Sequence, residues 1–308
     1  MKKVLKIIGI IVLVIIIIVI VLLKILSNKP FVPKDYTETV ETGGDIETKY
    51  IKMGNYEVSS IEETIMHGFQ KYIIYYPSEL NNSNKKYPVV VFVNGSGAKV
   101  SKYSALLEHM ASWGFIAIGT EEEYDWNASA SVSIISHLKR LNDNEIYNEK
   151  ENAFYQKIDL DNVGITGHSQ GGVGVINAIT DTKYKDVYKC AVSLSPTNKE
   201  LANNLEWYYD ATKIDIPILL VSGAGGGDDW VVTGEQIDEI YNDIPNSKIK
   251  VRKVDTPHGE ILYKADGYVT AWFMYYLKND EEAGKAFFGD NAEILNNKNY
   301  QDQRIDLQ

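Results

Sequence analysis

The five residues 167–171, Gly-His-Ser-Gln-Gly, fit the pattern G-x-S-x-G, in which a serine hydroxyl is raised above the carboxyl end of a strand. The motif follows an apolar run at 163–166 and precedes a helical pattern that starts at Gly172, which is the strand-turn-helix context that it needs. Glycines are required at both ends because side chains there would collide with neighbouring strand and helix. Ser169 is therefore the predicted nucleophile of an acyl-transfer reaction.

A serine hydroxyl is a poor nucleophile until a base accepts its proton, and histidine is the usual base because its pKa lies near neutrality. His258 follows the last strand pattern, in the loop 255–259, and should emerge at the same sheet edge as Ser169. The sequence therefore predicts His258 as the base. Structural or solvated positions are expected for the other four histidines, His67, His109, His137 and His168.

The acid that orients the histidine should lie on a strand-end loop between Ser169 and His258. The apolar run 218–221 leads into such a loop, which contains the adjacent carboxylates Asp228 and Asp229. Asp229 is preferred because the residues after it resemble an acid-x-aliphatic-aliphatic pattern. Asp228 stays open as the alternative, since the three glycines at 225–227 loosen the register.

Backbone N–H groups that are fixed in advance usually stabilise the oxyanion of such a reaction. Gln170, directly after the nucleophile, should supply one of them. The second should come from the glycine-containing loop 94–97, which follows the strand pattern at 89–93, and Ser96 is the predicted donor.

Aromatic side chains follow two of the predicted strands at the same edge of the sheet. Tyr124, Trp126 and Trp230 are candidates for a wall that contacts the acyl or alcohol group of a substrate. The run of glutamates at 121–123 would disfavour anionic substrates if it borders the cleft.

Short apolar runs alternate with amphipathic segments along the chain, which predicts a mainly parallel sheet with helices on both faces. The strand patterns lie at 72–76, 89–93, 115–118, 163–166, 191–194, 218–221 and 249–254. The helical patterns lie at 102–113, 130–141, 172–180, 234–241 and 268–277. The connection between 194 and 218 is too short for a large helical cap, so an open site is expected.

The first residues differ from the rest because lysines at 2, 3 and 6 precede an apolar run from Ile7 to Leu23. Such a run rises about 26 Å as a helix, close to the roughly 30 Å of a bilayer core. We predict a cytoplasmic tail and transmembrane anchor at 1–26, a stalk at 27–45 and a catalytic domain at 46–308. The early positive charge would place that domain outside the cytoplasm, on a single-pass protein of the cell membrane.

The net charge of −11 argues against nucleic acid as a partner, because an acidic protein repels phosphate backbones. Cys190 is the only cysteine, so no disulfide can form within the chain, and its apolar neighbours predict a buried thiol in a strand.

From about Phe69 to Gly289 the sequence resembles the capless α/β-hydrolases, which include dienelactone-hydrolase-like, chlorophyllase-like and cutinase or polyester-hydrolase-like esterases. The resemblance is carried by the segments 75–78, 111–115, 167–172 and 270–273. It implies an α/β-hydrolase fold and a cofactor-free Ser-His-Asp triad, formed here by Ser169, His258 and Asp229, that acts on carboxylic esters. Asn94 departs from the family pattern, which usually has histidine before the glycine of the oxyanion loop.

The predicted function is hydrolysis of carboxylic esters, in small molecules, lipids or polymers, through an acyl-enzyme. The same triad can also serve an acyltransferase or a peptidase. A surface binding protein without turnover is the alternative from a different class, and an intact triad argues against it.

Overall fold

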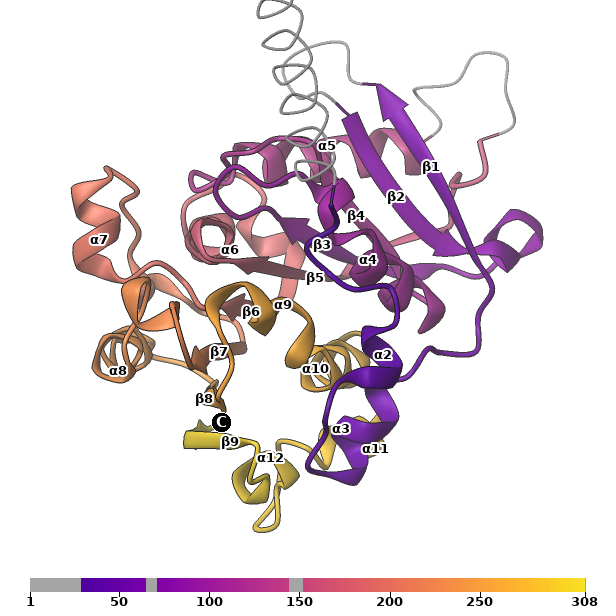
Figure 1. The fold of residues 1–308 in the computed structure, drawn as a ribbon. Coiled ribbons are helices and arrows are strands. Elements are labelled where there is room, and N and C mark those ends of the chain that lie inside the picture. The colour runs from indigo at the N-terminus through magenta and orange to yellow at the C-terminus, as the bar shows by residue number, and fades with distance from the viewer. Residues whose placement is uncertain (1–28, 65–70, 144–151, 308) are drawn as a thin grey trace, which may run out of the picture. The chain divides into compact units, whose positions relative to one another are not determined.

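The computed structural model describes residues 29–64, 71–143 and 152–307, which form one sheet of nine strands in the order β1-β2-β4-β3-β5-β6-β7-β8-β9 (Figure 1). Neighbouring strands run parallel from β4 across to β8, and β1, β2 and β9 are antiparallel to their neighbours. The strands are β1 (Val58–Thr64), β2 (Lys71–Pro77), β3 (Tyr87–Val93), β4 (Ile116–Thr120), β5 (Ile158–His168), β6 (Tyr188–Leu194), β7 (Ile218–Ala224), β8 (Lys248–Val254) and β9 (Tyr300–Asp306).

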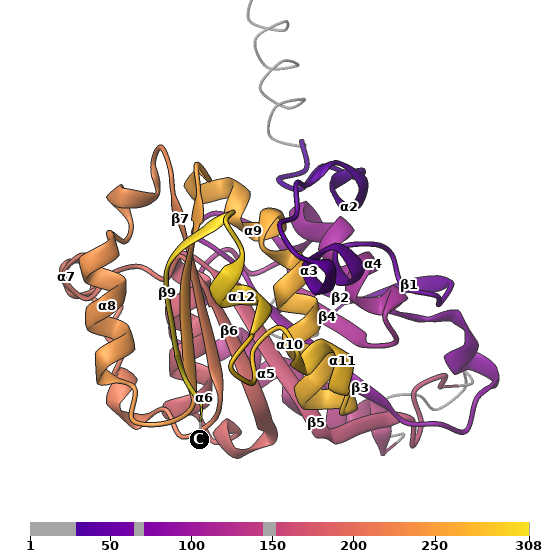
Figure 2. The same cartoon turned by 90° about the horizontal axis from the view of Figure 1, so that it is seen from below.

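Helices cover both faces of this sheet because successive residues of a strand point to opposite sides. Val90 of β3 packs into a core with α4 and α10, whereas its neighbours Val89 and Val91 pack into a second core with α5, α6 and α8. Figure 2 shows α8 and α10 on opposite sides of the strands. The helices are α2 (Tyr36–Thr39), α3 (Asp45–Tyr50), α4 (Ser104–Ser112), α5 (Ser129–Asn142), α6 (Gln170–Thr180), α7 (Lys199–Asn204), α8 (Gly234–Asp243), α9 (Ile261–Lys264), α10 (Asp266–Lys278), α11 (Glu281–Gly284) and α12 (Glu293–Asn296).

This architecture confirms the predicted α/β fold with a mainly parallel sheet, and each predicted strand and helix is present. The edge strands β1 and β9 were not among the predicted strands. Between β6 and β7 the chain forms α7 and one short 3₁₀ turn at Ala211–Lys213, so no helical cap is inserted there.

The prediction of a stalk at 27–45 is wrong for most of its length, because the chain is part of the compact domain from Val32 onward. Val32 and Tyr36 are buried. The Tyr36 hydroxyl donates to Asp266 Oδ2 of α10 at 2.5 Å, and burial followed by the Asp266 charge raises the pKa of Tyr36 well above its ordinary value. The catalytic domain therefore starts before residue 46.

The predicted anchor at 7–23 lies outside the described residues. Among the residues that are described, no helix is both long enough and apolar enough to cross a membrane.

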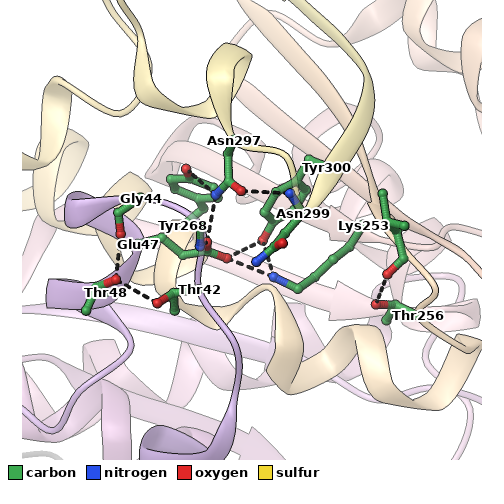
Figure 3. A network of polar contacts seen from close by, with 12 residues as sticks. Thr42, Gly44, Glu47, Thr48, Lys253, Thr256, Tyr268, Asn297, Asn299 and Tyr300 are labelled. Carbon is green, nitrogen blue, oxygen red and sulfur yellow. Dashed lines mark hydrogen bonds and ion pairs between the residues drawn. The ribbon is translucent and has the colours of Figure 1, made fainter.

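A buried polar network, centred on Glu47, joins α3 to the strands at the other end of the chain (Figure 3). Glu47 Oε1 accepts hydrogen bonds from Lys253 Nζ at 2.9 Å and from the Tyr300 hydroxyl at 2.8 Å, and Oε2 accepts from Asn297 Nδ2 at 2.7 Å. Burial lowers the pKa of Lys253, and the Glu47 charge acts in the opposite direction. The network fixes β8, which leads directly into the loop that carries His258.

Replacing Glu47 by alanine should leave the Lys253 ammonium group buried without its counter-charge, because Lys253 is almost fully buried. We expect the free energy of unfolding to fall by about 3–5 kcal/mol, measured by urea denaturation of the full-length chain. Glu282→Ala is the matched control, since it removes a carboxylate that pairs with Lys49 at the surface. It should change stability little. Equal effects of the two substitutions would contradict a special role for the buried network.

Candidate active site

Ser169 lies between β5 and α6 with backbone angles φ 60° and ψ −120°, a region that side-chain-bearing residues rarely adopt. Its N–H donates to the Leu194 carbonyl of β6 at 2.9 Å, and its carbonyl accepts from Gly172 N–H at 2.9 Å. These bonds hold the strained turn at the carboxyl end of β5. The residue is half-buried, so part of it is open to solvent.

The two outer glycines of the motif are required because backbone atoms lie too close to leave room for a side chain, as the sequence predicted. A Cβ atom on Gly167 would lie 2.4 Å from the Gly171 carbonyl oxygen. A Cβ atom on Gly171 would lie 2.3 Å from the Val93 carbonyl oxygen of β3. Because both obstacles are backbone atoms, a larger residue at either position would displace the turn at Ser169.

His258 begins a short 3₁₀ turn after β8, and Asp228 begins another after β7. The Nδ1 atom of His258 lies 2.6 Å from Asp228 Oδ1. The Asp228 side chain is 0% exposed, and that of His258 is 22% exposed. A buried carboxylate therefore accepts the Nδ1 proton, which leaves Nε2 as the acceptor nitrogen of the neutral ring.

The preference for Asp229 as the acid is wrong in this geometry, and the alternative Asp228 is the residue that contacts His258. Gly227 has a positive φ of 92°, which turns Asp228 inward. The Asp229 side chain is 65% exposed, and its Oδ1 accepts from Arg252 Nη2 at 3.0 Å. Arg252 thus holds Asp229 on the outer side of the turn.

Of the two predicted oxyanion donors, Gln170 is the first residue of α6, where backbone N–H groups lack partners inside the helix. Ser96 is exposed in the loop after β3. The backbone on either side of Ser96 is fixed, because Gly97 N–H donates to the Glu123 carbonyl at 3.0 Å and Asn94 Nδ2 donates to the Thr120 carbonyl at 2.7 Å. Asn94 therefore helps to fix this loop through its side chain.

The three predicted wall residues lie on loops at the carboxyl ends of β4 and β7. Trp230 is 86% exposed, Tyr124 is exposed and Trp126 is half-buried. Asn177 of α6 joins the loop of Trp126 to a further aromatic loop, since its Nδ2 donates to the Trp126 carbonyl at 2.8 Å and to the Tyr208 carbonyl at 3.0 Å. Tyr208 was not predicted, although the aromatic run 207–209 is visible in the sequence.

The remaining histidines that the structure describes have structural partners, as expected. His109 of α4 lies with its Nδ1 atom 2.7 Å from Asp266 Oδ2, and His137 of α5 pairs with Glu63 and stacks on Tyr72. His67 lies outside the described residues. Cys190 is buried in β6, as predicted, and burial raises the pKa of its thiol well above the ordinary value.

The sheet order, the strained serine turn and the buried Asp-His pair define an α/β-hydrolase. Residues 35–303 match the family model described as "PETase: PET hydrolase-like", and the chain belongs to this family. This match confirms the resemblance to the polyester-hydrolase-like branch.

The chain is also similar to the bis(hydroxyethyl) terephthalate hydrolase of Streptomyces coelicolor, with 26% identity over 198 residues. The aligned region covers 63% of this chain and 57% of that protein. The chain thus spans little more than half the length of this relative.

Proposed function

We propose that this protein is a serine esterase that hydrolyses carboxylic esters through an acyl-enzyme, with Ser169 as nucleophile, His258 as base and Asp228 as the orienting acid. The observation that carries the proposal is the hydrogen bond between the Asp228 carboxylate and His258 Nδ1, which accompanies the strained turn at Ser169. Membership in the PET hydrolase-like family supports ester chemistry.

In the proposed reaction, Ser169 Oγ attacks the ester carbonyl carbon while its proton passes to His258 Nε2. The Gln170 and Ser96 N–H groups donate to the oxyanion that forms. His258 then gives its proton to the leaving alkoxide, and an acyl group stays on Ser169. Water then takes the place of the released alcohol, gives a proton to His258 Nε2 and attacks the acyl carbon. The bond to Ser169 Oγ breaks, His258 returns the proton to that oxygen, and the carboxylic acid leaves.

Terephthalate diesters and polyesters are the substrate class that the comparisons suggest, since the Streptomyces relative is a bis(hydroxyethyl) terephthalate hydrolase. The exposed aromatic side chains of Trp230 and Tyr124 would contact a flat acyl group of this kind.

The anchor predicted at 7–23 would hold the enzyme at the outer face of the cell membrane, which protease accessibility of intact cells would test.

A fluorophosphonate probe and an ester panel test the proposal on the full-length chain. We expect one covalent adduct, located by mass spectrometry on Ser169, and cleavage of both p-nitrophenyl acetate and bis(hydroxyethyl) terephthalate. Added alcohols should leave the free acid as the main product, which separates hydrolysis from acyl transfer. Absence of an adduct, or an adduct at another residue, would refute the assignment.

A further inference from the structure

We infer that His168, which precedes the nucleophile, is a positioning residue for the catalytic base. The inference rests on the proposed function. His168 Nε2 lies 2.8 Å from the backbone carbonyl oxygen of His258, and the two rings lie 4.3 Å apart between centroids with an interplanar angle of 39°. The residue before the nucleophile thus holds the backbone of the loop that carries the base.

The hydrogen bond fixes which nitrogen of His168 carries the proton. A carbonyl oxygen only accepts, so Nε2 must be the donor. Burial, and then the neighbouring His258, lower the pKa of His168 to about 3. The ring is therefore neutral throughout the pH range in which a serine esterase works, and its single N–H is committed to His258.

The other side of the His168 ring faces the oxyanion loop. A Cβ atom on Gly95 would lie 3.5 Å from His168 Nδ1 and 3.2 Å from the His168 carbonyl oxygen. Gly95 N–H is itself held by the Tyr103 hydroxyl at 3.4 Å. The imidazole of His168 thus occupies the space between the loop of Ser96 and the loop of His258.

The ring has little room to leave this position. His168 is 7% exposed. The space behind it, shared by Tyr103, Leu194 and Leu262, amounts to only about 20 Å³, roughly the room of one water molecule. A rotamer change that broke the bond to His258 would therefore require movement of the surrounding core.

His258 is consequently attached at two points: Asp228 orients the imidazole, and His168 holds the main chain. The second attachment matters because the loop before His258 contains Asp255 with a positive φ of 48°, a conformation that costs energy unless neighbours enforce it. Loss of the His168 bond should let the loop shift, and a displacement of the base by about 1 Å can cost about 100-fold in rate.

The test compares His168→Phe, which keeps a ring but has no N–H, with His168→Gln, which restores a donor near the position of Nε2. For p-nitrophenyl acetate we expect His168→Phe to lower kcat by about 30- to 100-fold with KM within about threefold of wild type. His168→Gln should recover kcat to within about fivefold. His137→Phe is the matched control, since it replaces another buried histidine that pairs far from the catalytic loop with Glu63; it should leave kcat unchanged.

Three outcomes would overturn the inference. His168→Phe with kcat within threefold of wild type would show that the bond is not needed, and a loss that His168→Gln does not reverse would point to simple damage to packing. A KM increase with unchanged kcat would instead indicate a substrate contact. If wild-type protein reacts with the fluorophosphonate, these results bear on His168 alone, whereas unlabelled wild type would refute the triad and this inference with it.

Discussion

Replacing Ser169 with alanine is expected to lower kcat for p-nitrophenyl acetate by about 10⁶-fold, because no acyl-enzyme can form without the hydroxyl. The variant should also lose all labelling by fluorophosphonate. Its fold should persist, since the bonds that hold the strained turn are made by the backbone N–H and carbonyl of residue 169. Residual activity would reflect the oxyanion donors and substrate binding alone.

Ser195→Ala is a suitable control for this substitution. Ser195 also has a positive φ, 40°, and also follows a strand of the sheet, but its side chain is fully buried. Its replacement should leave kcat within a few-fold of wild type. Retention of activity by Ser169→Ala, or equal losses in the two variants, would rule out Ser169 as the nucleophile.

The second large effect is expected from the adjacent carboxylates. Asp228→Asn should lower kcat by about 10⁴-fold, because an amide can donate to Nδ1 of His258 and stabilise the tautomer that cannot act as a base. Asp229→Asn should stay within about threefold of wild type, since Asp229 pairs with Arg252 at the surface and such exposed pairs contribute little.

The two variants change the same atoms at neighbouring positions, so each controls for the other. Steady-state rates between pH 6 and 9 and the thermal midpoint of each variant should be measured together. A larger loss in Asp229→Asn than in Asp228→Asn would reverse the assignment of the acid. If both variants lose the same factor in kcat and the same amount in thermal midpoint, the cause would be damage to the turn and not loss of the Asp228 carboxylate.

Local sequence patterns were sufficient to predict the central part of the fold. The buried runs of β3, β5 and β7 are continuous in the sequence. The glycines at 167 and 171 form a visible local pattern, although the steric constraint on Gly171 comes from Val93 of β3. The position of His258 at this edge of the sheet could be predicted because the carboxyl ends of parallel strands meet there. Each of these features leaves a pattern that is visible within a short stretch of the sequence.

The acid could not be assigned in the same way. Asp228 and Asp229 are chemically identical neighbours, and the left-handed conformation of Gly227 together with the position of Arg252 decides which of them faces inward. Three consecutive glycines permit several backbone paths. Which of the two carboxylates contacts His258 therefore depends on tertiary contacts that no local pattern contains.

The structure of the N-terminal part of the domain could not be predicted for a related reason. Residues 32–50 show no clear periodicity, and their partners are remote: Tyr36 contacts Asp266, and Glu47 contacts Lys253 and Tyr300. A segment that is stabilised by single buried side chains, each bound to a distant part of the chain, looks like a linker when it is considered alone. The same holds for β9, which has polar residues and forms an edge.

The pairing of β9 with β8 has a consequence for biosynthesis. Glu47 and Tyr300 are 253 positions apart and share a hydrogen bond, and Tyr300 lies at the start of β9. While residues 297–306 are still inside the ribosomal exit tunnel, β8 presents an uncovered edge and the carboxylate of Glu47 lacks two of its donors. Completion of the native state must therefore wait until residues 297–306 have left the tunnel, and chaperones can engage the uncovered edge of β8 until then.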